Sequence, residues 1–277
     1  MKAAVIKRMA SKALDELAMA LDDGHSESLK AYLAMLGKFH RYSPGNVLLI
    51  HLQCPGATHV AGYRTWQRLG RQVKQGEKAI RILAPVVYRE TEDDDETERK
   101  LVAFKAACVF DVAQTEGEAL PEFAKVQGDC CEQLDRLKQW IREQGITLTY
   151  TNRIGPAQGA SAGGTVFLRE DLEPAEEFSA LVHEVAHERL HQDKVERSKT
   201  VCETEAEAVA FVVNQAVGLD CSTASSDYVQ LYDGTKETLM ESLERIQQAA
   251  REIIQAVVSE PEERTRHEPQ QEALAAA

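Results

Sequence analysis

The chain has 277 residues, of which 43% are hydrophobic and 28% are charged. This length and composition support one large domain or two ordinary ones and exclude a disordered chain. No apolar run approaches the roughly 20 residues that cross a bilayer. The N-terminal stretch carries Asp15, Glu16 and Asp22 and lacks the uninterrupted apolar segment of a secretory signal. We therefore expect a cytoplasmic protein with no membrane partner.

The cysteines show no framework spacing. The six of them (Cys54, Cys108, Cys130, Cys131, Cys202 and Cys221) include no CxxC pair. This excludes a zinc ribbon and is typical of free thiols in a cytosolic protein.

The net charge of −13 is distributed unevenly along the chain. Residues 38–81 contain eight Lys or Arg residues and one acidic residue, Glu77, whereas residues 90–98 contain seven acidic residues and no basic one. A basic segment inside an acidic chain indicates a polyanionic partner, so the overall charge does not exclude nucleic acid.

The first half of the sequence predicts helices followed by a compact α+β region. Apolar residues three and four apart, such as Leu29, Leu33 and Leu36, favour helices over residues 1–21 and 26–39. A Ser-Pro-Gly turn interrupts this pattern. Beyond it we expect residues 47–52 to form a helix or a strand, followed by an α+β stretch over 57–87 that contains a helix near 64–69. A strand over 101–110 should form a hairpin with the strand that ends this stretch, and the acidic run would be the loop of the hairpin. Residues 114–121 predict a linker.

The second half predicts a small sheet among amphipathic helices. We expect helices over 133–143, 174–190, 200–217 and 235–258, and strands over 146–151 and 164–169. Residues 259–277 are polar and predict a flexible tail. The fold class is therefore α+β in two domains, residues 1–125 and residues 130–258.

The most specific motif is the HExxH pattern on the predicted helix 174–190. His183 and His187 are one helical turn apart, so both rings can reach one metal ion, and Glu184 then faces the water on that metal. A bare HExxH also occurs by chance on helix surfaces. Here a strand and a second helix flank it in the order found in zincins, which favours a metal site.

The third ligand is less constrained by the sequence. Glu203 and Glu207 share a face of the next helix, which suggests Glu203 as the ligand and Glu207 as a carboxylate that orients a ligand histidine. His191, one turn beyond His187, is an alternative ligand. The acidic cluster could also merely complement the dipole of its helix.

Residues 163–168 predict a strand just before the HExxH helix. At a sheet edge this strand could pair with an extended peptide substrate; a buried structural strand explains the pattern equally well. Tyr228 and Tyr232 could donate to an oxyanion, although packing explains them better.

The basic segment interleaves cations with aromatic residues. This arrangement suits single-stranded nucleic acid, because cations follow the phosphates while bases stack on aromatic rings. The alternative is a solvated basic face with Tyr63 and Trp66 in the core. The candidate contacts are Arg41, Tyr42, Asn46, Tyr63, Arg64, Trp66, Arg68, Arg71, Lys74 and Lys78.

Residues 39–85 (FHRYSPG to RILAP), with the VFD of 109–111 and the QTEG of 114–117, resemble the N-terminal domain of ArdC-type antirestriction proteins. The resemblance covers about residues 5–125. It implies that residues 1–125 form a single-stranded DNA-binding domain and that the protein comes from a mobile element such as a plasmid.

The second half resembles the gluzincin-like metallopeptidases of the ImmA/IrrE class. His183, Glu184 and His187 match their HExxH, and residues 203–207 (ETEAE) match their second motif, with Glu207 where Asp or Asn is common. The resemblance implies that residues 130–258 form a zincin-like metallopeptidase domain.

These observations predict a single-stranded DNA-binding zinc metallopeptidase of the antirestriction type that acts on an unidentified protein substrate. In this hypothesis His183, His187 and Glu203 bind Zn²⁺, or Mn²⁺ or another divalent ion, and Glu184 is the general base. Two alternatives stay open. One is a non-catalytic DNA-protecting protein with a structural zinc site, and the other is a regulatory peptidase that cleaves a repressor.

Overall fold

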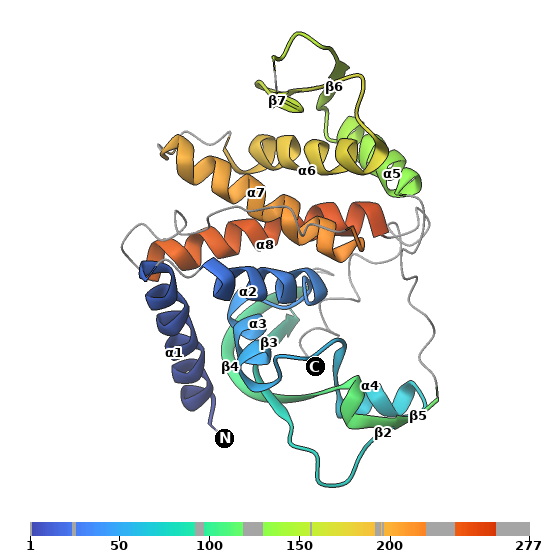
Figure 1. Ribbon diagram of the computed structural model, residues 1–277. Coiled ribbons are helices and arrows are strands. Elements are labelled where there is room, and N and C mark those ends of the chain that lie inside the picture. Colours follow the sequence, from blue (N-terminus) through green and yellow to red (C-terminus); the bar gives the residue numbers. More distant parts are fainter. Residues whose placement is uncertain are drawn as a thin grey trace. The chain divides into compact units, whose positions relative to one another are not determined.

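The computed structural model describes residues 2–23, 26–91, 97–118, 130–155, 157–191, 195, 197–219 and 236–258. Tyr228, Tyr232 and the predicted tail 259–277 lie outside the described residues. Among the described helices, none is long and apolar enough to span a membrane. The mixture of helices and small sheets confirms the predicted α+β class (Figure 1).

Contacts divide the chain into two compact units. Unit 1 holds the described residues of 1–16 and 45–121, and unit 2 holds those of 17–44 and 122–264. The predicted first domain, residues 1–125, includes residues 17–44. They group with the second half because helix α2 (Ser26–Lys38) packs on helix α7 (Lys199–Ala216). A Cβ at Gly37 of α2 would come within 2.8 Å of the Val212 carbonyl oxygen of α7, so the two helices touch at backbone distance.

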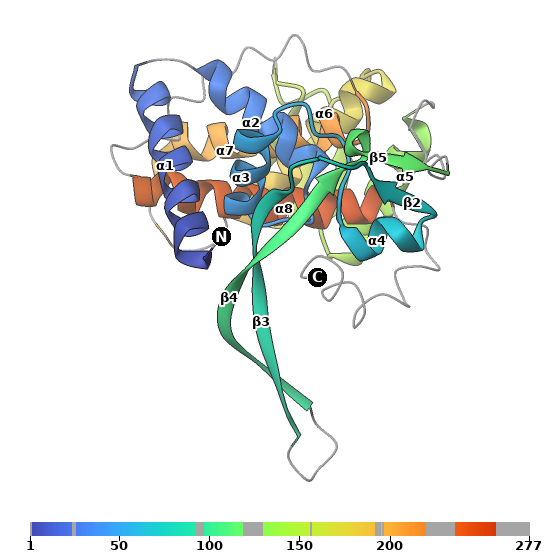
Figure 2. The ribbon, with the colours of Figure 1, turned by 90° about the horizontal axis from the view of Figure 1, so that it is seen from below.

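Unit 1 is built on a long antiparallel hairpin, β3 (Ile80–Thr91) and β4 (Thr97–Asp111), whose strands run side by side in Figure 2. The register runs from Ile80 opposite Val109 to Thr91 opposite Thr97, so part of the predicted acidic loop belongs to the strands. The remaining elements of this unit are most of α1 (Ala3–Asp22), α3 (Pro44–Gln53), β1 (Val60–Gly62), α4 (Tyr63–Arg68), β2 (Arg71–Val73), η1 (Val112–Gln114) and β5 (Thr115–Gly117).

Two features of unit 1 correct or resolve sequence expectations. Residues 47–52 are helical, and α3 is tied to β3 by the Asn46 amide, which accepts from the Leu83 N–H at 2.9 Å and donates to the Leu83 carbonyl at 2.8 Å. The predicted linker 114–121 was wrong in part, because β5 pairs with β2 from Thr115 to Gly117. Polar composition alone did not reveal this short strand.

Unit 2 is a stack of helices with a three-stranded sheet. Helices α6 (Pro174–Leu190), α7 and α8 (Lys236–Val258) pack on one another, and α5 (Cys131–Glu143) packs on α6 and α8. The predicted apolar stripes are buried: Phe178, Leu181 and Val185 of α6 have no exposed surface. The sheet order is β6 (Thr147–Tyr150), β8 (Thr165–Leu168), β7 (Gly159–Ser161).

Candidate functional site

The residues around the start of helix α6 are typical of a helix N-terminus. Pro174 occupies its first turn, and Glu173 and Glu176 form a reciprocal capping box that satisfies free backbone N–H groups. Ser198 is the N-cap residue of helix α7, and its side chain accepts a hydrogen bond from the Val201 N–H at 3.2 Å. The two helices pack together and bring their polar motifs into contact.

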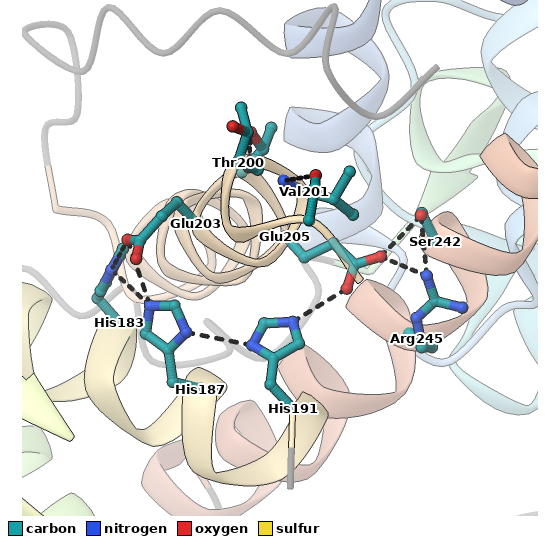
Figure 3. A network of polar contacts seen from close by, with 11 residues as sticks. His183, His187, His191, Thr200, Val201, Glu203, Glu205, Ser242 and Arg245 are labelled. Carbon is teal, nitrogen blue, oxygen red and sulfur yellow. Dashed lines mark hydrogen bonds and ion pairs between the residues drawn. The ribbon is translucent and has the colours of Figure 1, made fainter. Parts of the chain in front are cut away.

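Two histidines of α6 and a carboxylate of α7 converge on one point (Figure 3). His183 Nε2 and His187 Nε2 are 3.1 Å apart, and Glu203 Oε2 lies 3.5 Å from the first and 3.4 Å from the second. Ligand atoms at about 2.0–2.2 Å from a tetrahedral zinc ion are separated by about 3.3–3.6 Å. Within the described part of the chain, these three residues form the group that could hold a metal ion, and their spacing fits one.

Glu207 and Glu184 flank the three candidate ligands. Glu207 Oε2 lies 3.4 Å from His183 Nδ1, the ring nitrogen that does not face His187. Glu184 is buried, which raises the pKa of its carboxyl group, while the positive charge of His183 and a hydrogen bond from Ser161 oppose that rise. No sequence pattern indicates Ser161, which lies on the short strand β7.

The charges around the histidines have opposite effects on them. Burial would lower the pKa of His183, but the hydrogen bond with Glu207 and the carboxylates of Glu184 and Glu203 outweigh it, so the pKa is raised. Burial and the neighbouring His183 lower the pKa of His187. A neutral His187 ring beside a carboxylate is the state in which an imidazole binds metal.

His191 lies on the other side of His187, away from Glu203 (Figure 3). Its Nε2 is 3.1 Å from Glu205 Oε2, and Glu205 is also bonded to Ser242 and Arg245 of α8. Burial would raise the pKa of Glu205, but hydrogen bonds from His191, Arg245 and Ser242 lower it to about 2. His191 therefore lies outside the group of three candidate ligands.

The strand at residues 163–168 is not at a sheet edge. Strand β8 lies between β6, with which it is parallel, and β7, with which it is antiparallel. Its backbone is therefore paired on both sides, so of the two alternatives for this segment the structural strand is confirmed and the peptide-pairing edge is excluded. The edge that packs on α6 belongs to β7, which is too short and too rich in glycine and alanine to show a strand pattern.

The ten candidate DNA contacts are divided between the units. Arg41 and Tyr42 belong to unit 2, and the other eight belong to unit 1. In unit 1 the exposed candidates are Tyr63, Arg64, Arg68, Lys74 and Lys78.

Three of the candidates in unit 1 are held by the fold itself. Trp66 is 2% exposed and donates its indole N–H to the Phe110 carbonyl at 2.9 Å, so its ring is not available for base stacking. The Asn46 amide is bonded to β3 as described above. Arg71 donates through Nε to Thr115 Oγ1 at 2.8 Å and braces β2 against β5.

Residues 5–110 match the family model of the N-terminal domain of the anti-restriction factor ArdC. The fold is similar to that of the antirestriction ArdC protein from the R388 plasmid in its metal-free crystal structure, with a TM-score of 0.54 and 17% identity over 90% of this chain and 97% of that chain. Residues 5–110 thus match the ArdC N-terminal domain, and the chain has a fold similar to that of ArdC.

The R388 ArdC crystal structure described as Mn(II)-bound is equally similar, with a TM-score of 0.54, 17% identity and coverage of 91% of this chain and 99% of that one. This chain is also 24% identical to a protein of Bacillus anthracis described as uncharacterized, over 80% of this chain. It spans about half, 46%, of the length of that relative.

Proposed function

We infer that this chain is an ArdC-type protein and that its unit 2 is a divalent-metal peptidase. The observation that carries this inference is the spacing of His183 Nε2, His187 Nε2 and Glu203 Oε2, at 3.1–3.5 Å from one another, with the buried carboxyl group of Glu184 beside them. Two imidazoles and a carboxylate are the ligand set of many catalytic zinc sites.

The donor set accepts more than one metal. Nitrogen and oxygen ligands suit Zn²⁺, Mn²⁺ and other first-row ions. The description of R388 ArdC as Mn(II)-bound supports a divalent ion in a protein of this fold. A bound ion would supply Lewis acidity, which polarises a substrate carbonyl and acidifies water.

Residues of this chain would carry the proton transfers. Glu184 would accept a proton from the attacking water and return it to the leaving amine nitrogen, and the burial that raises its pKa makes the carboxylate a better proton acceptor in the first step. Glu207, 3.4 Å from His183 Nδ1, orients that ring.

The outer edge of β7 offers a place for an extended peptide. Strand β7 is the last strand of its sheet, so one side of its backbone is not used within the sheet, and it packs on α6 close to Glu184. A peptide that adds to such an edge is held by main-chain hydrogen bonds, which leaves its carbonyl groups in a regular position.

Unit 1 would deliver this peptidase to single-stranded DNA. The exposed cations Arg64, Arg68 and Lys78 suit phosphates, and Tyr63, 48% exposed, suits a base. DNA binding would raise the effective concentration of the peptidase near proteins on the same strand. This arrangement fits an antirestriction role in the cytoplasm, where DNA carried by a mobile element enters.

The test compares the wild-type chain with Glu184→Gln and His183→Ala. We expect about one metal ion per chain in the wild type and in Glu184→Gln, and loss of the metal in His183→Ala. Cleavage of peptide libraries or of single-strand-binding proteins should disappear in Glu184→Gln. Full cleavage by that variant would refute the mechanism.

The same variants separate the alternatives. Unchanged protection of single-stranded DNA by Glu184→Gln, with no cleavage by the wild type, would favour a DNA-protecting protein with a structural metal. Cleavage of a repressor without salt-dependent DNA affinity would favour a regulatory peptidase.

A further inference from the structure

A continuous row of hydrogen bonds leads from the candidate metal ligand His187 to helix α8 (Figure 3). His187 Nδ1 lies 3.1 Å from His191 Nδ1, and His191 Nε2 lies 3.1 Å from Glu205 Oε2. The other oxygen of Glu205 accepts hydrogen bonds from Ser242 Oγ at 2.7 Å and from the Arg245 guanidinium. The row joins α6, α7 and α8.

The protons of this row have one consistent arrangement when His187 Nε2 faces a metal ion. A neutral ring that binds through Nε2 carries its proton on Nδ1, so His187 donates to His191 Nδ1. His191 then carries its own proton on Nε2 and donates it to Glu205, which accepts as a carboxylate. Each of the two ring N–H groups then has an acceptor, so the Glu205 carboxylate sets the tautomer of both rings.

The row is shielded from water, which makes its partners hard to replace. The Glu205 side chain is 0% exposed and the His191 side chain is 11% exposed. A buried carboxylate is stable only where its charge is matched and its oxygens are bonded. Arg245 and Ser242 supply both, and they keep the carboxylate where His191 needs its acceptor.

The backbone also holds His191 in place. His191 is the residue at which α6 ends, and its N–H donates to the His187 carbonyl at 3.0 Å. The ring is therefore positioned at both ends, by the last turn of α6 and by Glu205 of α7.

We propose that His191, Glu205 and Arg245 are positioning residues of the metal centre, which hold the His187 ring in the orientation and tautomer that leave Nε2 free for the ion. This inference rests on the proposed metal site. It extends that site to α8, whose sequence contains no ligand signal. Hydrogen-bond partners behind a metal-binding histidine typically account for about 10–100-fold in metal affinity.

The experiment measures metal affinity in the full chain, with Mn²⁺ followed by the electron paramagnetic resonance signal of the free ion and Zn²⁺ by competition with a chromophoric chelator. His191→Phe keeps a ring but removes both nitrogens, so we expect it to weaken the affinity about 10–100-fold. In His191→Gln the amide can accept from His187 and donate to Glu205, so it should recover most of this loss. Arg245→Gln should weaken the affinity in the same direction.

Arg189→Gln is the matched control. Arg189 also pairs α6 with α8, through Glu252, but it does not touch the row. We expect its metal affinity to equal that of the wild type. Circular dichroism and thermal unfolding in the presence of a chelator identify variants that do not fold. If Arg245→Gln does not fold, the comparison of His191→Phe with His191→Gln decides the outcome.

Wild-type affinity in a folded His191→Phe variant would overturn the positioning role and leave the metal site intact. Equal losses in Arg189→Gln and Arg245→Gln would also overturn it, because the effect would then come from general packing of α6 on α8. A wild-type chain that binds neither ion would instead refute the proposed metal site, and this inference with it.

Discussion

A methyl group at position 159 of strand β7 would stand 2.7 Å from Cγ of Glu184 and 2.9 Å from its Oε1. Ordinary carbon contacts are about 3.5–4.0 Å, so no side chain fits at Gly159 while Glu184 keeps its place. The edge strand of the small sheet thus sets the position of the proposed general base on α6.

Gly159→Ala should displace the Glu184 carboxyl group without removing it. Because a shift of about 1 Å in a reacting group can cost 100-fold in rate, we expect kcat/KM for peptide cleavage to fall about 10–100-fold, with metal content unchanged. Steady-state kinetics and metal analysis of the same preparation check both parts. Gly56→Ala is the control, since a Cβ there meets nothing within 4 Å. Normal kinetics in Gly159→Ala would contradict the proposed placement of Glu184.

The HExxH motif is predictable from the sequence, but the strand beside it is not. The helical spacing of the apolar residues Phe178, Leu181 and Val185, which are buried in the structure, predicts α6, and the HExxH motif on that helix predicts a metal site. Strand β7 forms because its three residues pair with β8, which follows a few residues later, and its Gly-Ala-Ser sequence lacks the residues that favour strands. The role of Glu205 was equally hidden, because its partner Arg245 is 40 residues away in sequence.

The grouping of α2 with unit 2 also lay beyond the sequence. An apolar stripe shows that Leu29, Leu33 and Leu36 are buried, but not which helix covers them. The close approach of Gly37 to Val212 shows that α7 is the helix on which α2 packs.

Gly37→Ala is predicted to destabilise unit 2. In an exposed helix interior this change usually stabilises by about 0.5–1 kcal/mol. Here the new Cβ lies 2.8 Å from the Val212 carbonyl oxygen, so α2 and α7 must separate, and we expect a loss of about 1–3 kcal/mol. Urea unfolding followed by circular dichroism measures it. Gly45→Ala in α3, with nothing within 4 Å, should be neutral or stabilising; the same loss at both positions would rule out the packing explanation.

Because His40 is buried in its neutral form, we expect the folded state to lose stability in acid. Burial lowers its pKa to about 4; the hydrogen bond between Nδ1 and the Gly37 carbonyl opposes this, and the charges of Arg41 and Arg251 add to it. An unfolded histidine titrates near its ordinary value of 6.5, so between about pH 6.5 and 4 the unfolded chain binds a proton that the folded chain does not. Stability should therefore fall as the pH falls through this range.

The slope that His40 contributes is at most about 1.4 kcal/mol per pH unit. Urea unfolding at several pH values should show a shallower dependence for His40→Gln than for the wild type. Identical pH profiles of the two proteins would show that His40 is not buried in its neutral form.

The two aromatic residues of α4 should respond differently to removal. Tyr63 is 48% exposed, so Tyr63→Ala should weaken binding of single-stranded DNA by about 1–3 kcal/mol and leave the unfolding midpoint nearly unchanged. Trp66 is buried and bonded to Phe110, so Trp66→Ala should lower stability by about 3–5 kcal/mol. Fluorescence anisotropy and urea unfolding separate the two effects. An unchanged DNA affinity in Tyr63→Ala would remove this residue from the interface.

The salt dependence of binding tests the exposed cations of unit 1. For a single strand the slope of log affinity against log salt is about −0.7 per phosphate neutralised, so Lys78→Ala should make the slope less steep by about 0.7 if Lys78 contacts a phosphate. Arg71→Ala should also lower the unfolding midpoint, because Arg71 braces β2 against β5. Lys12→Ala is the control, since Lys12 is exposed and paired with Glu16 on α1. If Lys12→Ala and Lys78→Ala change the slope equally, the attraction comes from the overall charge of the protein and not from a basic surface on unit 1.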